Sequence, residues 1–139
     1  MPDPGLARAL LEAFRAVDAE IQSALEDRGV DLSPGHARGI LLVDRTGTRL
    51  SELAHRAQVT KQAMMQVLDD LESNGYVRRT ADPTDSRAKI VKLTAKGLRQ
   101  RAAARRALAS VDQSIRRSLG DRRIDALQST LQDLAAIRE

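Results

Sequence analysis

The sequence lacks cysteine and tryptophan, and its only aromatic side chains are Phe14 and Tyr76. Without cysteine the chain has no disulfide, no thiolate metal site and no cysteine redox switch. Its core must consist of aliphatic side chains and methionine, and a ligand pocket has few rings to offer. No apolar run approaches the roughly 18 residues that span a bilayer, and the N-terminus does not resemble a signal peptide. These absences lead us to expect a cytoplasmic protein.

Positive charge is concentrated in the middle of the chain. The 139 residues suffice for one ordinary domain and carry a net charge of +4. The net charge is −3 over residues 1–47, +7 over residues 48–106 and zero over residues 107–139. The central excess indicates a face that meets a polyanion, although a solvated arginine-rich surface accounts for it equally well.

Helical periodicity marks both ends of the chain. Over residues 5–28 apolar side chains recur three and four positions apart, and Gly29 is placed to end that helix. Thr94 is placed to cap a second long helix. Gly120-Asp121 ends this helix and caps the last one, which follows it. The apolar side of the second long helix carries Leu98, Leu108, Val111, Ile115 and Leu119.

A shorter helix is predicted after the first one. Ser33-Pro34 supplies an N-cap residue followed by proline at the first helical position, which is typical of a helix start. We expect this helix to end near Asp44 and to be followed by a turn over residues 45–48. Its inward face carries Ala37, Ile40 and Leu41.

The next two predicted helices form a helix-turn-helix. One covers residues 50–57, and the other opens at Thr60 after a tight turn at Gln58-Val59 and stops at Asn74-Gly75. The buried stripe of the latter helix consists of Met64, Val67, Leu68 and Leu71, at the i, i+3, i+4 and i+7 positions. Two short helices joined by a turn of a few residues are the pattern of this motif.

Two short strands are predicted after the helix-turn-helix. YVRRT over residues 76–80 and AKIVKL over residues 88–93 are rich in β-forming side chains. The six residues between them, ADPTDS, are dense in turn formers, so we expect a projecting loop. The fold class is therefore mainly α with a small β-hairpin, in the order of four helices, the hairpin and two helices.

Three motifs lie in the middle of the chain: LSELA at residues 50–54, GYVxR at residues 75–79 and DPxDxRxxxVxLTxxG at residues 82–97. Together they resemble the motifs of the MarR family of winged-helix transcriptional regulators. The motifs cover residues 50–97, and the helical layout extends the resemblance over nearly the whole chain. The resemblance implies a single unit over residues 1–139 that binds double-stranded DNA.

The same resemblance divides the chain into a reading head and dimerisation helices. It places a winged helix-turn-helix DNA-binding region at residues 33–94 and N- and C-terminal dimerisation helices at residues 5–28 and 95–139. The implied function is a sequence-specific regulator, expected to be a repressor, that acts as a homodimer on a pseudo-palindromic operator. Release by a small-molecule effector is a further implication, and a regulator without an effector is the alternative.

The sequence departs from the family pattern at two places. Ala63-Met64-Met65-Gln66 replaces a Thr-Val-Thr-Arg-like run, so Gln66 occupies the position of a common arginine. The position that usually carries a capping residue for the third helix is Arg49, with Thr48 as the nearest alternative cap.

The N-terminal half of the fourth helix is the predicted base-reading element. Gln can pair bidentately with adenine, Lys can reach guanine, and a methionine can touch a thymine methyl group. The C-terminal half carries Asp69, Asp70 and Glu72, which would repel phosphates, so we expect the N-terminal half to enter the groove. The predicted contacts are Thr60, Lys61, Gln62, Met65 and Gln66.

The hairpin corresponds to the family's wing, which lies near the minor groove or its phosphates. The resemblance implies that Asp85 holds basic side chains such as Arg87 in position, and arginine suits a narrow minor groove. The predicted wing contacts are Thr84, Asp85, Ser86, Arg87 and Lys89. A group of basic residues after the hairpin is interpreted as a surface that adds positive potential without direct contacts to DNA. Its members are Lys92, Lys96, Arg99, Arg101, Arg105 and Arg106. Lys92 and Lys96 lie nearest the hairpin and are the exceptions for which we expect contact.

The apolar stripes at the two ends of the chain predict a homodimer. A small winged helix cannot bury both stripes by itself, and pairing them between two chains would set two reading heads about 34–36 Å apart. The predicted interface residues are Leu10, Phe14, Val17, Ile21, Ile124, Leu127, Leu131 and Leu134.

Nothing in the sequence indicates catalysis. His36 and His55 are the only histidines, and plain packing or surface roles are expected for them. No nucleophile–base pair, paired catalytic carboxylates or glycine-rich phosphate loop is visible, so we predict no enzyme activity, no metal and no cofactor. The alternative to a DNA-binding regulator is a winged-helix module that docks proteins without specific DNA readout.

Overall fold

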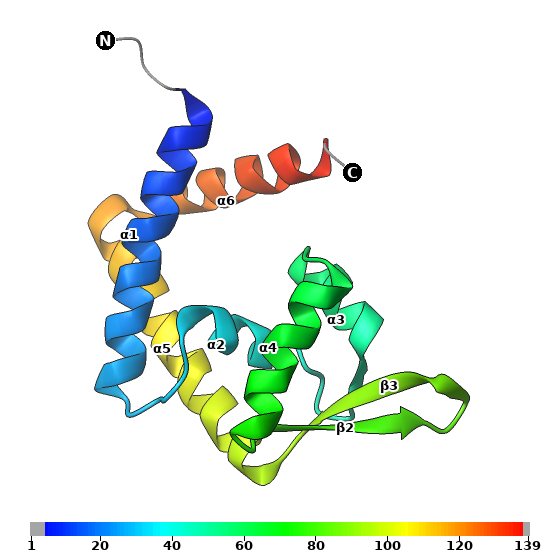
Figure 1. Cartoon of the computed structure of the whole chain (residues 1–139). Helices are drawn as coiled ribbons and strands as arrows, with labels where there is room; N and C mark the ends of the chain where they lie inside the picture. The colour runs from blue at the N-terminus through cyan, green and yellow to red at the C-terminus, as the bar shows by residue number, and fades with distance from the viewer. Residues whose placement is uncertain (1–4, 138–139) are drawn as a thin grey trace.

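The computed structural model describes residues 5–137. Residues 1–4 and 138–139, the ends of the predicted 1–139 unit, lie outside the described residues. The elements follow the predicted order with one addition, a short strand before the third helix (Figure 1). They are α1 (Leu6–Asp27), α2 (Pro34–Leu41), β1 (Thr48–Arg49), α3 (Leu50–Ala57), α4 (Lys61–Ser73), β2 (Val77–Asp82), β3 (Asp85–Leu93), α5 (Ala95–Leu119) and α6 (Asp121–Ala136).

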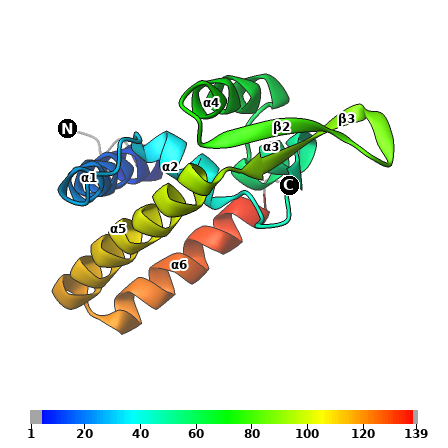
Figure 2. The ribbon, with the colours of Figure 1, turned by 90° about the horizontal axis from the view of Figure 1, so that it is seen from below.

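The elements form a head and an arm. The head, from α2 to β3, holds three short helices and the sheet, and the hairpin of β2 and β3 projects from it (Figure 1). The arm consists of α1, α5 and α6. From the hairpin α5 runs to a corner at Gly120, where α6 begins and diverges from it (Figure 1 and Figure 2). The mainly α fold with a small β-hairpin is confirmed.

The core lies in the head and at its junction with the arm. Only the last turns of α1 are buried, at Ala24 and Leu25. The largest fully buried side chains are Leu25, Ile40, Val43, Leu53, Leu68, Leu71 and Val91. Because these side chains come from α1 to α4 and from β3, the core fixes the helix-turn-helix against the sheet and the base of the arm.

The predicted caps are confirmed at three helix starts. The hydroxyls of Ser33, Thr60 and Thr94 accept hydrogen bonds from the backbone N–H groups of His36, Ala63 and Gly97, respectively. At the helix ends, Gly29 and Gly75 adopt positive φ angles of 67° and 80°. Each follows the last turn of a helix, where only glycine takes that conformation without strain.

The third helix begins differently from both predicted alternatives. Arg49 occupies the N-cap position of α3, but its side chain makes no cap hydrogen bond. The Thr48 hydroxyl accepts from the backbone N–H of Asp44 at 2.8 Å and so closes the preceding turn. The predicted end of α2 near Asp44 was too late, because the helix ends at Leu41.

The predicted six-residue loop of the hairpin was wrong. The strands extend to Asp82 and from Asp85, which leaves a turn of only Pro83 and Thr84. The Asp82 carboxylate accepts from the N–H and the hydroxyl of Thr84, both at 2.8 Å, and from Arg49. These bonds close the turn tightly, whereas turn composition alone indicated a longer loop.

The sheet has a third strand and an irregular register. Thr48 and Arg49 pair with Val91 and Ile90, so the strand order is β1-β3-β2. Ala81 pairs with Lys89 but Asp82 pairs with Asp85, so residues 86–88 of β3 have no partner on β2. This irregularity displaces residues 86–88 from the ladder near the tip of the hairpin.

The buried face of α5 differs from the predicted leucine stripe. Leu119 is 44% exposed, and Leu98 and Leu108 are only half-buried. The buried residues of α5 are Gly97, Arg101, Ala104, Ala107 and Val111. Small side chains let α5 approach α1 and α2 closely, so the apolar contacts come from short residues rather than from leucines.

Arg101 was wrongly interpreted as a surface residue. It is 8% exposed and donates a hydrogen bond to the backbone carbonyl of Val43, beyond the end of α2. Burial lowers the pKa of its guanidinium, with a further contribution from Arg105 and Arg45. Arg101 therefore connects the arm to the head and is not available to DNA.

The break between α5 and α6 is confirmed, but Asp121 does not cap α6. The N-cap residue is Gly120, with a φ of 90°, and α6 has no side-chain cap. The Asp121 carboxylate instead accepts from Arg116 at 3.3 Å, and Asp125 accepts from the same guanidinium at 2.8 Å. Arg116 therefore holds the corner of the arm. Among residues 5–137, no helix has the length and apolar character needed to cross a membrane.

The N-terminus of α5 and the end of α4 meet at Tyr76. Its carbonyl accepts from the N–H of Thr94 at 3.1 Å, and its hydroxyl donates to the carbonyl of Asp31. A Cβ on Gly97 would lie 1.9 Å from the Tyr76 carbonyl oxygen. Only glycine permits this approach, which joins α4, the hairpin and α5 at one point.

We expect Gly97→Ala to destabilise the fold. The added methyl must push α5 away from Tyr76, which costs on the order of 1–3 kcal/mol of unfolding free energy or more. Gly35→Ala is the matched control, because its Cβ would meet nothing closer than 3.9 Å. The control should be neutral or stabilising by roughly 0.5–1 kcal/mol. Urea unfolding measures both, and equal stabilities would contradict a tight contact at Gly97.

Candidate nucleic-acid interface

The predicted reading residues lie together on the exposed face of the N-terminal half of α4. All five, Thr60, Lys61, Gln62, Met65 and Gln66, are exposed. Gln62 and Gln66 are four residues apart, as are Lys61 and Met65, so the members of each pair are neighbours on the helix surface. Within residues 5–137 the side chains of Lys61, Gln62 and Gln66 have no hydrogen-bond partner. Their donors and acceptors are thus available to a ligand.

The turn that presents this face is held in an uncommon conformation. Gln58 has a φ of 54° and is the only non-glycine residue with positive φ in the described part of the chain. The N–H of Val59 donates to the carbonyl of Ala54 at 3.1 Å, which closes the end of α3. The Thr60 cap then starts α4 two residues after Gln58, so the angle between the two helices is set locally.

The acidic half of α4 is compensated by a cation that sequence reasoning missed. Arg79 of β2 lies 2.6 Å from Asp69 and 3.0 Å from Glu72, and its backbone N–H also donates to Glu72. The Arg79 side chain and the backbone bond hold the pKa of Glu72 below its usual value, and Glu72 raises the pKa of Arg79. Repulsion of phosphates by this end of α4 is therefore weaker than its composition indicates.

The third acidic residue of α4 contacts α2. His36 Nε2 lies 3.1 Å from Asp70 Oδ2, and His36 Nδ1 lies 2.6 Å from the Ser33 hydroxyl. His36 therefore has a packing role at the junction of two helices, while His55 is exposed on α3. No group of three or more His, Asp or Glu side chains in residues 5–137 is arranged to hold a metal ion.

The wing tip presents Arg87 to solvent. The side chain of Arg87 is 93% exposed, and its guanidinium lies 3.7 Å from the Asp85 carboxylate. The carboxylate also accepts from the Arg87 backbone N–H at 3.0 Å. Asp85 thus holds the backbone of Arg87 by a hydrogen bond, whereas the guanidinium lies farther from the carboxylate and is less constrained. Ser86 and Lys89 are also exposed at the tip, and the Thr84 hydroxyl bonds to Asp82.

Two residues outside the predicted set shape the wing. Asp82 is buried beneath the turn, and Arg49 reaches it from the start of α3 at 2.6 Å. Hydrogen bonds from Thr84, followed by the Arg49 contact, hold the pKa of Asp82 below its usual value. An aspartate that accepts from the backbone N–H two residues on is a common turn former, so the turn-rich segment around Pro83 is the sequence signal for Asp82. No sequence signal identifies Arg49, because its partner lies 33 positions away.

The basic residues after the wing do not form one surface. The Lys96 ammonium donates to the carbonyl of Asn74 at 2.8 Å and lies 4.6 Å from the centroid of the Tyr76 ring. Lys96 therefore holds the junction of α4 and α5 and is a poorer candidate for DNA than its sequence position indicated. Lys96 is nevertheless exposed, as are Lys92, Arg99, Arg105 and Arg106, whereas Arg101 is buried.

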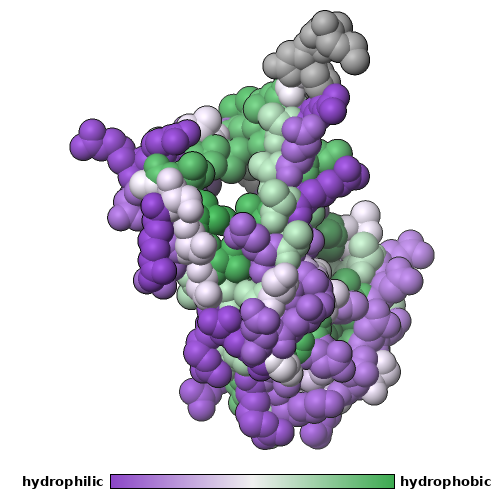
Figure 3. Space-filling model, turned by 90° about the vertical axis from the view of Figure 1, so that its left-hand side faces the viewer, coloured by the Kyte–Doolittle hydropathy of each residue, from purple (hydrophilic) through white to green (hydrophobic). Residues whose placement is uncertain are grey.

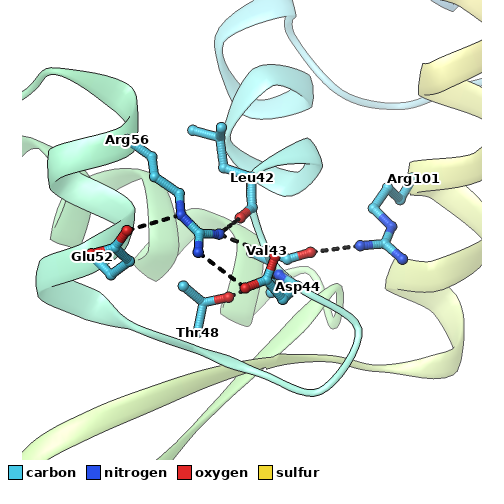
Figure 4. A network of polar contacts seen from close by, with 7 residues as sticks. All are labelled: Leu42, Val43, Asp44, Thr48, Glu52, Arg56 and Arg101. Atoms are coloured by element: carbon cyan, nitrogen blue, oxygen red, sulfur yellow. Dashed lines mark hydrogen bonds and ion pairs between the residues drawn. The ribbon is translucent and has the colours of Figure 1, made fainter.

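A polar network fixes α3 against the end of α2 (Figure 4). The Arg56 guanidinium donates two hydrogen bonds of 3.1 Å to the Asp44 carboxylate. It also donates to Glu52 at 3.2 Å and to the carbonyl of Leu42 at 3.0 Å. The hydrogen bond from Arg56 lowers the pKa of Asp44, and the bond to Asp44 raises the pKa of Arg56. The network therefore holds α3, the first helix of the helix-turn-helix, in place against α2.

The predicted dimer residues differ in how far they are exposed in the single chain. Phe14 and Leu127 are 53% and 49% exposed, and Val17 and Leu131 are also exposed. Leu10, Ile21 and Leu134 are half-buried, whereas Ile124 is buried within the chain. Apolar surface gathers over the upper end of the molecule, where the arm lies, and hydrophilic surface covers most of the lower part (Figure 3).

Comparison with known proteins agrees with the geometry, because the similar proteins are regulators of transcription. A family model described as "MarR family" matches residues 30–88. The HTH-type transcriptional repressor Rv2887 of Mycobacterium tuberculosis (strain ATCC 25618 / H37Rv) is 37% identical over 109 residues, which cover 78% of this chain and 76% of that protein.

Two solved structures of similar fold contain ligands. The transcriptional repressor CouR bound to a 23-mer DNA duplex matches with a TM-score of 0.85 and 29% identity, over 94% of this chain and 92% of that one. CouR from Rhodococcus jostii RHA1 bound to p-coumaroyl-CoA matches with a TM-score of 0.79 and 21% identity, over 95% and 92% of the two chains. The latter likeness shows the fold alone.

The pairing of Arg79 with the acidic half of α4 leads to a prediction for DNA binding. In Arg79→Met the carboxylates of Asp69 and Glu72 lose their cation and repel phosphates, so affinity for duplex DNA should fall roughly 3- to 10-fold at low salt. Adding Asp69→Asn should recover part of the loss.

The matched control is Arg122→Met on α6, which removes the same charge far from the head. Fluorescence anisotropy of a labelled duplex measures all four proteins, the unsubstituted chain included. Equal affinities of Arg79→Met and Arg122→Met would contradict this interpretation.

Proposed function

Since the chain belongs to the MarR family of transcriptional regulators, we propose that it is a repressor that binds an inverted-repeat operator as a homodimer. It is a DNA-binding regulator and not an enzyme. The observation that carries the proposal is that the head presents two exposed polar surfaces, the N-terminal half of α4 and the wing tip. There Lys61, Gln62 and Gln66 lack internal partners in residues 5–137, and Arg87 extends into solvent.

We assign base reading to the N-terminal half of α4. In the major groove, Gln62 and Gln66 have the donor–acceptor pair that matches adenine, and Lys61 can reach guanine. Met65 supplies an apolar contact for a thymine methyl group, and Thr60 retains a hydroxyl donor while its oxygen caps the helix. The carboxylates at the other end of α4 are engaged by Arg79 and His36 within the chain, whereas Lys61, Gln62 and Gln66 keep their polar groups available to the groove.

We assign backbone and minor-groove contacts to the wing. Arg87 and Lys89 are exposed at its tip, and residues 86–88 lie outside the paired ladder. An arginine there suits the negative potential of a narrow minor groove. Thr84, Asp85 and Ser86 complete this proposed contact set, with Asp85 holding the backbone of Arg87.

We further propose that residues 5–28 and 95–139 dimerise and that residues 33–94 form the reading head. Exposed apolar side chains on α1 and α6 support this division, because an isolated monomer would leave Phe14, Leu127 and Leu131 in water. Ile124 lies beneath this surface and supports it. Two heads held by such an arm would meet successive major grooves about 34–36 Å apart. A repressor of this kind acts in the cytoplasm.

Release by a small-molecule effector completes the proposal. CouR, which shares the fold, is a repressor in one structure and holds p-coumaroyl-CoA in another. Whether this chain responds to a ligand of that chemistry depends on its own cavities. The alternative is a repressor that binds its operator without regulation by a small molecule.

Two substitutions separate base reading from phosphate contact. Gln62→Ala should lower the ratio of operator to random-duplex affinity at least about 5-fold, because it removes one base contact from each half-site of the operator. Arg87→Ala should weaken both affinities alike and reduce the slope of log K against log salt by about 1.8, because each of the two subunits loses one phosphate contact. Arg122→Ala is the charge-matched control. The measurement is anisotropy titration over a salt series, and unchanged duplex binding in both variants would favour the protein-docking alternative.

Selection of bound sequences from a random duplex pool tests the whole proposal. A homodimer with two reading heads should enrich an inverted repeat whose half-sites lie one helical turn apart. Enrichment of a single half-site would contradict the dimeric reader, and no enrichment would contradict specific readout.

Substitutions on α6 test whether this helix forms part of the dimer interface. Leu131→Glu places a charge in the proposed interface and should convert the dimer to a monomer that keeps its helical content, because Leu131 is already 37% exposed in the chain. Gln132→Glu adds the same charge at the neighbouring exposed position. Sedimentation equilibrium measures the masses, and a dimeric Leu131→Glu would exclude this part of α6 from the interface.

A further inference from the structure

The N-terminal part of α1 extends beyond the head (Figure 1). The buried residues of α1 are Ala24 and Leu25 in its last turns, whereas Leu11 and Phe14 are exposed. The apolar core therefore holds only the C-terminal end of this helix. The direction of the rest of α1 depends on contacts outside the core.

Arg38 of α2 makes such contacts with the middle of α1. Its Nη1 donates to Asp18 Oδ1 at 2.6 Å, and its guanidinium carbon lies 5.3 Å from the centroid of the Phe14 ring. Phe14 and Asp18 are four residues apart, so they lie on the same side of α1. Among residues 5–137, the bond from Arg38 to Asp18 is the only side-chain hydrogen bond or ion pair that joins α1 to another helix or strand.

Another side of α2 meets the reading helix. Gly39 follows Arg38 in the sequence, and a Cβ on it would lie 3.1 Å from Val67 of α4. Successive residues point about 100° apart around a helix, so Arg38 reaches α1 while Gly39 contacts α4. A displacement of α1 that Arg38 follows is therefore passed on by α2 to α4.

The ring beside Arg38 belongs to the proposed dimer interface. Phe14 is 53% exposed in the single chain, so a partner that covers α1 would remove water from the ring and from the guanidinium over it. A cation–π contact is stronger when it is desolvated, and a covered ion pair is screened less by salt. Dimer formation should thus strengthen the contacts of Arg38 with α1.

The ion pair contributes little to the stability of the single chain. The side chains of Arg38 and Asp18 are 42% and 29% exposed, and solvent screens an ion pair at such exposure. Loss of the guanidinium should therefore leave the fold intact and change mainly the position of α1 relative to the head. This difference separates a positioning role from a merely structural one.

We propose that Arg38 is a positioning residue for operator binding, which couples the packing of α1 in the dimer to the distance between the two reading heads. In each chain it holds Phe14 and Asp18 against α2, and α2 in turn contacts α4. Arg38 acts through these contacts and not by touching DNA. The consequence for the operator rests on the homodimeric repressor proposed above, whereas the contact with α1 does not.

Operators of altered spacing test this role. The half-sites of the selected operator are moved one base pair apart or together, and a duplex with a single half-site is the reference for local contacts. A rigid dimer binds well only where the spacing fits both heads, so the parent chain should prefer the selected spacing. In Arg38→Met this preference should fall at least about fivefold, while affinity for the single half-site stays the same.

Arg38→Lys and Arg122→Met are the matched comparisons. Arg38→Lys keeps the charge beside Asp18 and should restore part of the preference, although it lacks the planar guanidinium. Arg122→Met removes a charge from α6 and should leave the preference unchanged. An equal preference in the parent chain and in Arg38→Met would contradict the positioning role. A loss of affinity that is the same for every duplex would show a merely structural role and would also overturn it.

Substitutions on α1 separate the two contacts of Arg38. Asp18→Ala removes the ion pair, and Phe14→Leu removes the ring but keeps an apolar side chain at the interface. Each should lower the spacing preference by less than Arg38→Met does, because one contact remains. Urea unfolding checks that the variants keep the stability of the parent chain, and Asp18→Ala replaces Arg38→Met if the latter does not fold. Parent-like preference in both α1 variants would exclude α1 as the helix through which Arg38 acts.

A spin label at the wing tip tests the position of the heads without DNA. The chain has no cysteine, so Ser86→Cys offers one labelling site on each subunit of the full chain. Double electron–electron resonance should give one narrow distribution of the distance between the two wing tips. Arg38→Met in the same background should broaden this distribution, and Arg122→Met should not.

The two experiments distinguish the proposals. Equal distance distributions in the parent chain and in Arg38→Met would refute the positioning role and leave the repressor intact. No measurable distance between labels would refute the homodimer and the positioning role with it. A distribution that Arg38→Met broadens, in a chain that selects no DNA sequence, would support the positioning role and refute specific readout.

Discussion

The close approach of α5 to Tyr76 is the contact on which the rest of the structure depends. Tyr76 follows the reading helix, starts the wing and accepts the hydrogen bond from Thr94 that opens α5. Its hydroxyl also reaches Asp31 in the connection between α1 and α2. Because Gly97 leaves no slack between the two backbones, a displacement of the arm is transmitted directly to the end of α4 and the root of the wing.

Many cations of the basic middle segment are engaged within the chain. Arg79 compensates carboxylates of α4, Arg49 binds Asp82, and Arg101 connects α5 to the end of α2. Their partners lie on other elements, so these arginines hold the head together. The carboxylates Asp69, Glu72 and Asp82 are already counted in the net charge of +7 over residues 48–106, so the pairing decides where that excess lies and not how large it is.

Local signals in the sequence predicted most of the elements, and long-range contacts account for what it missed. The hydroxyl caps, the glycine stops and the stripe of α4 depend on residues within one or two turns of each other, so periodicity and spacing revealed them. The strand β1 is two residues long and exists only because β3 lies beside it. The burial of Arg101 and the pairing of Arg79 likewise depend on partners that the fold brings together. For the same reason, the sequence indicated the candidate reading residues but not the long-range contacts of Arg49 and Arg101 that hold the head.

The helix α2 connects the arm to α4. Through Arg38 it contacts Asp18 and Phe14 of the arm, and through Gly39 it packs on Val67 of α4. A displacement of the arm therefore acts on the contact between α2 and α4. A Cβ on Gly39 would lie 3.1 Å from Val67, so a larger residue there would push the two helices apart. Gly39 thus determines how closely α4 approaches α2, and with it how directly α4 follows a displacement of the arm.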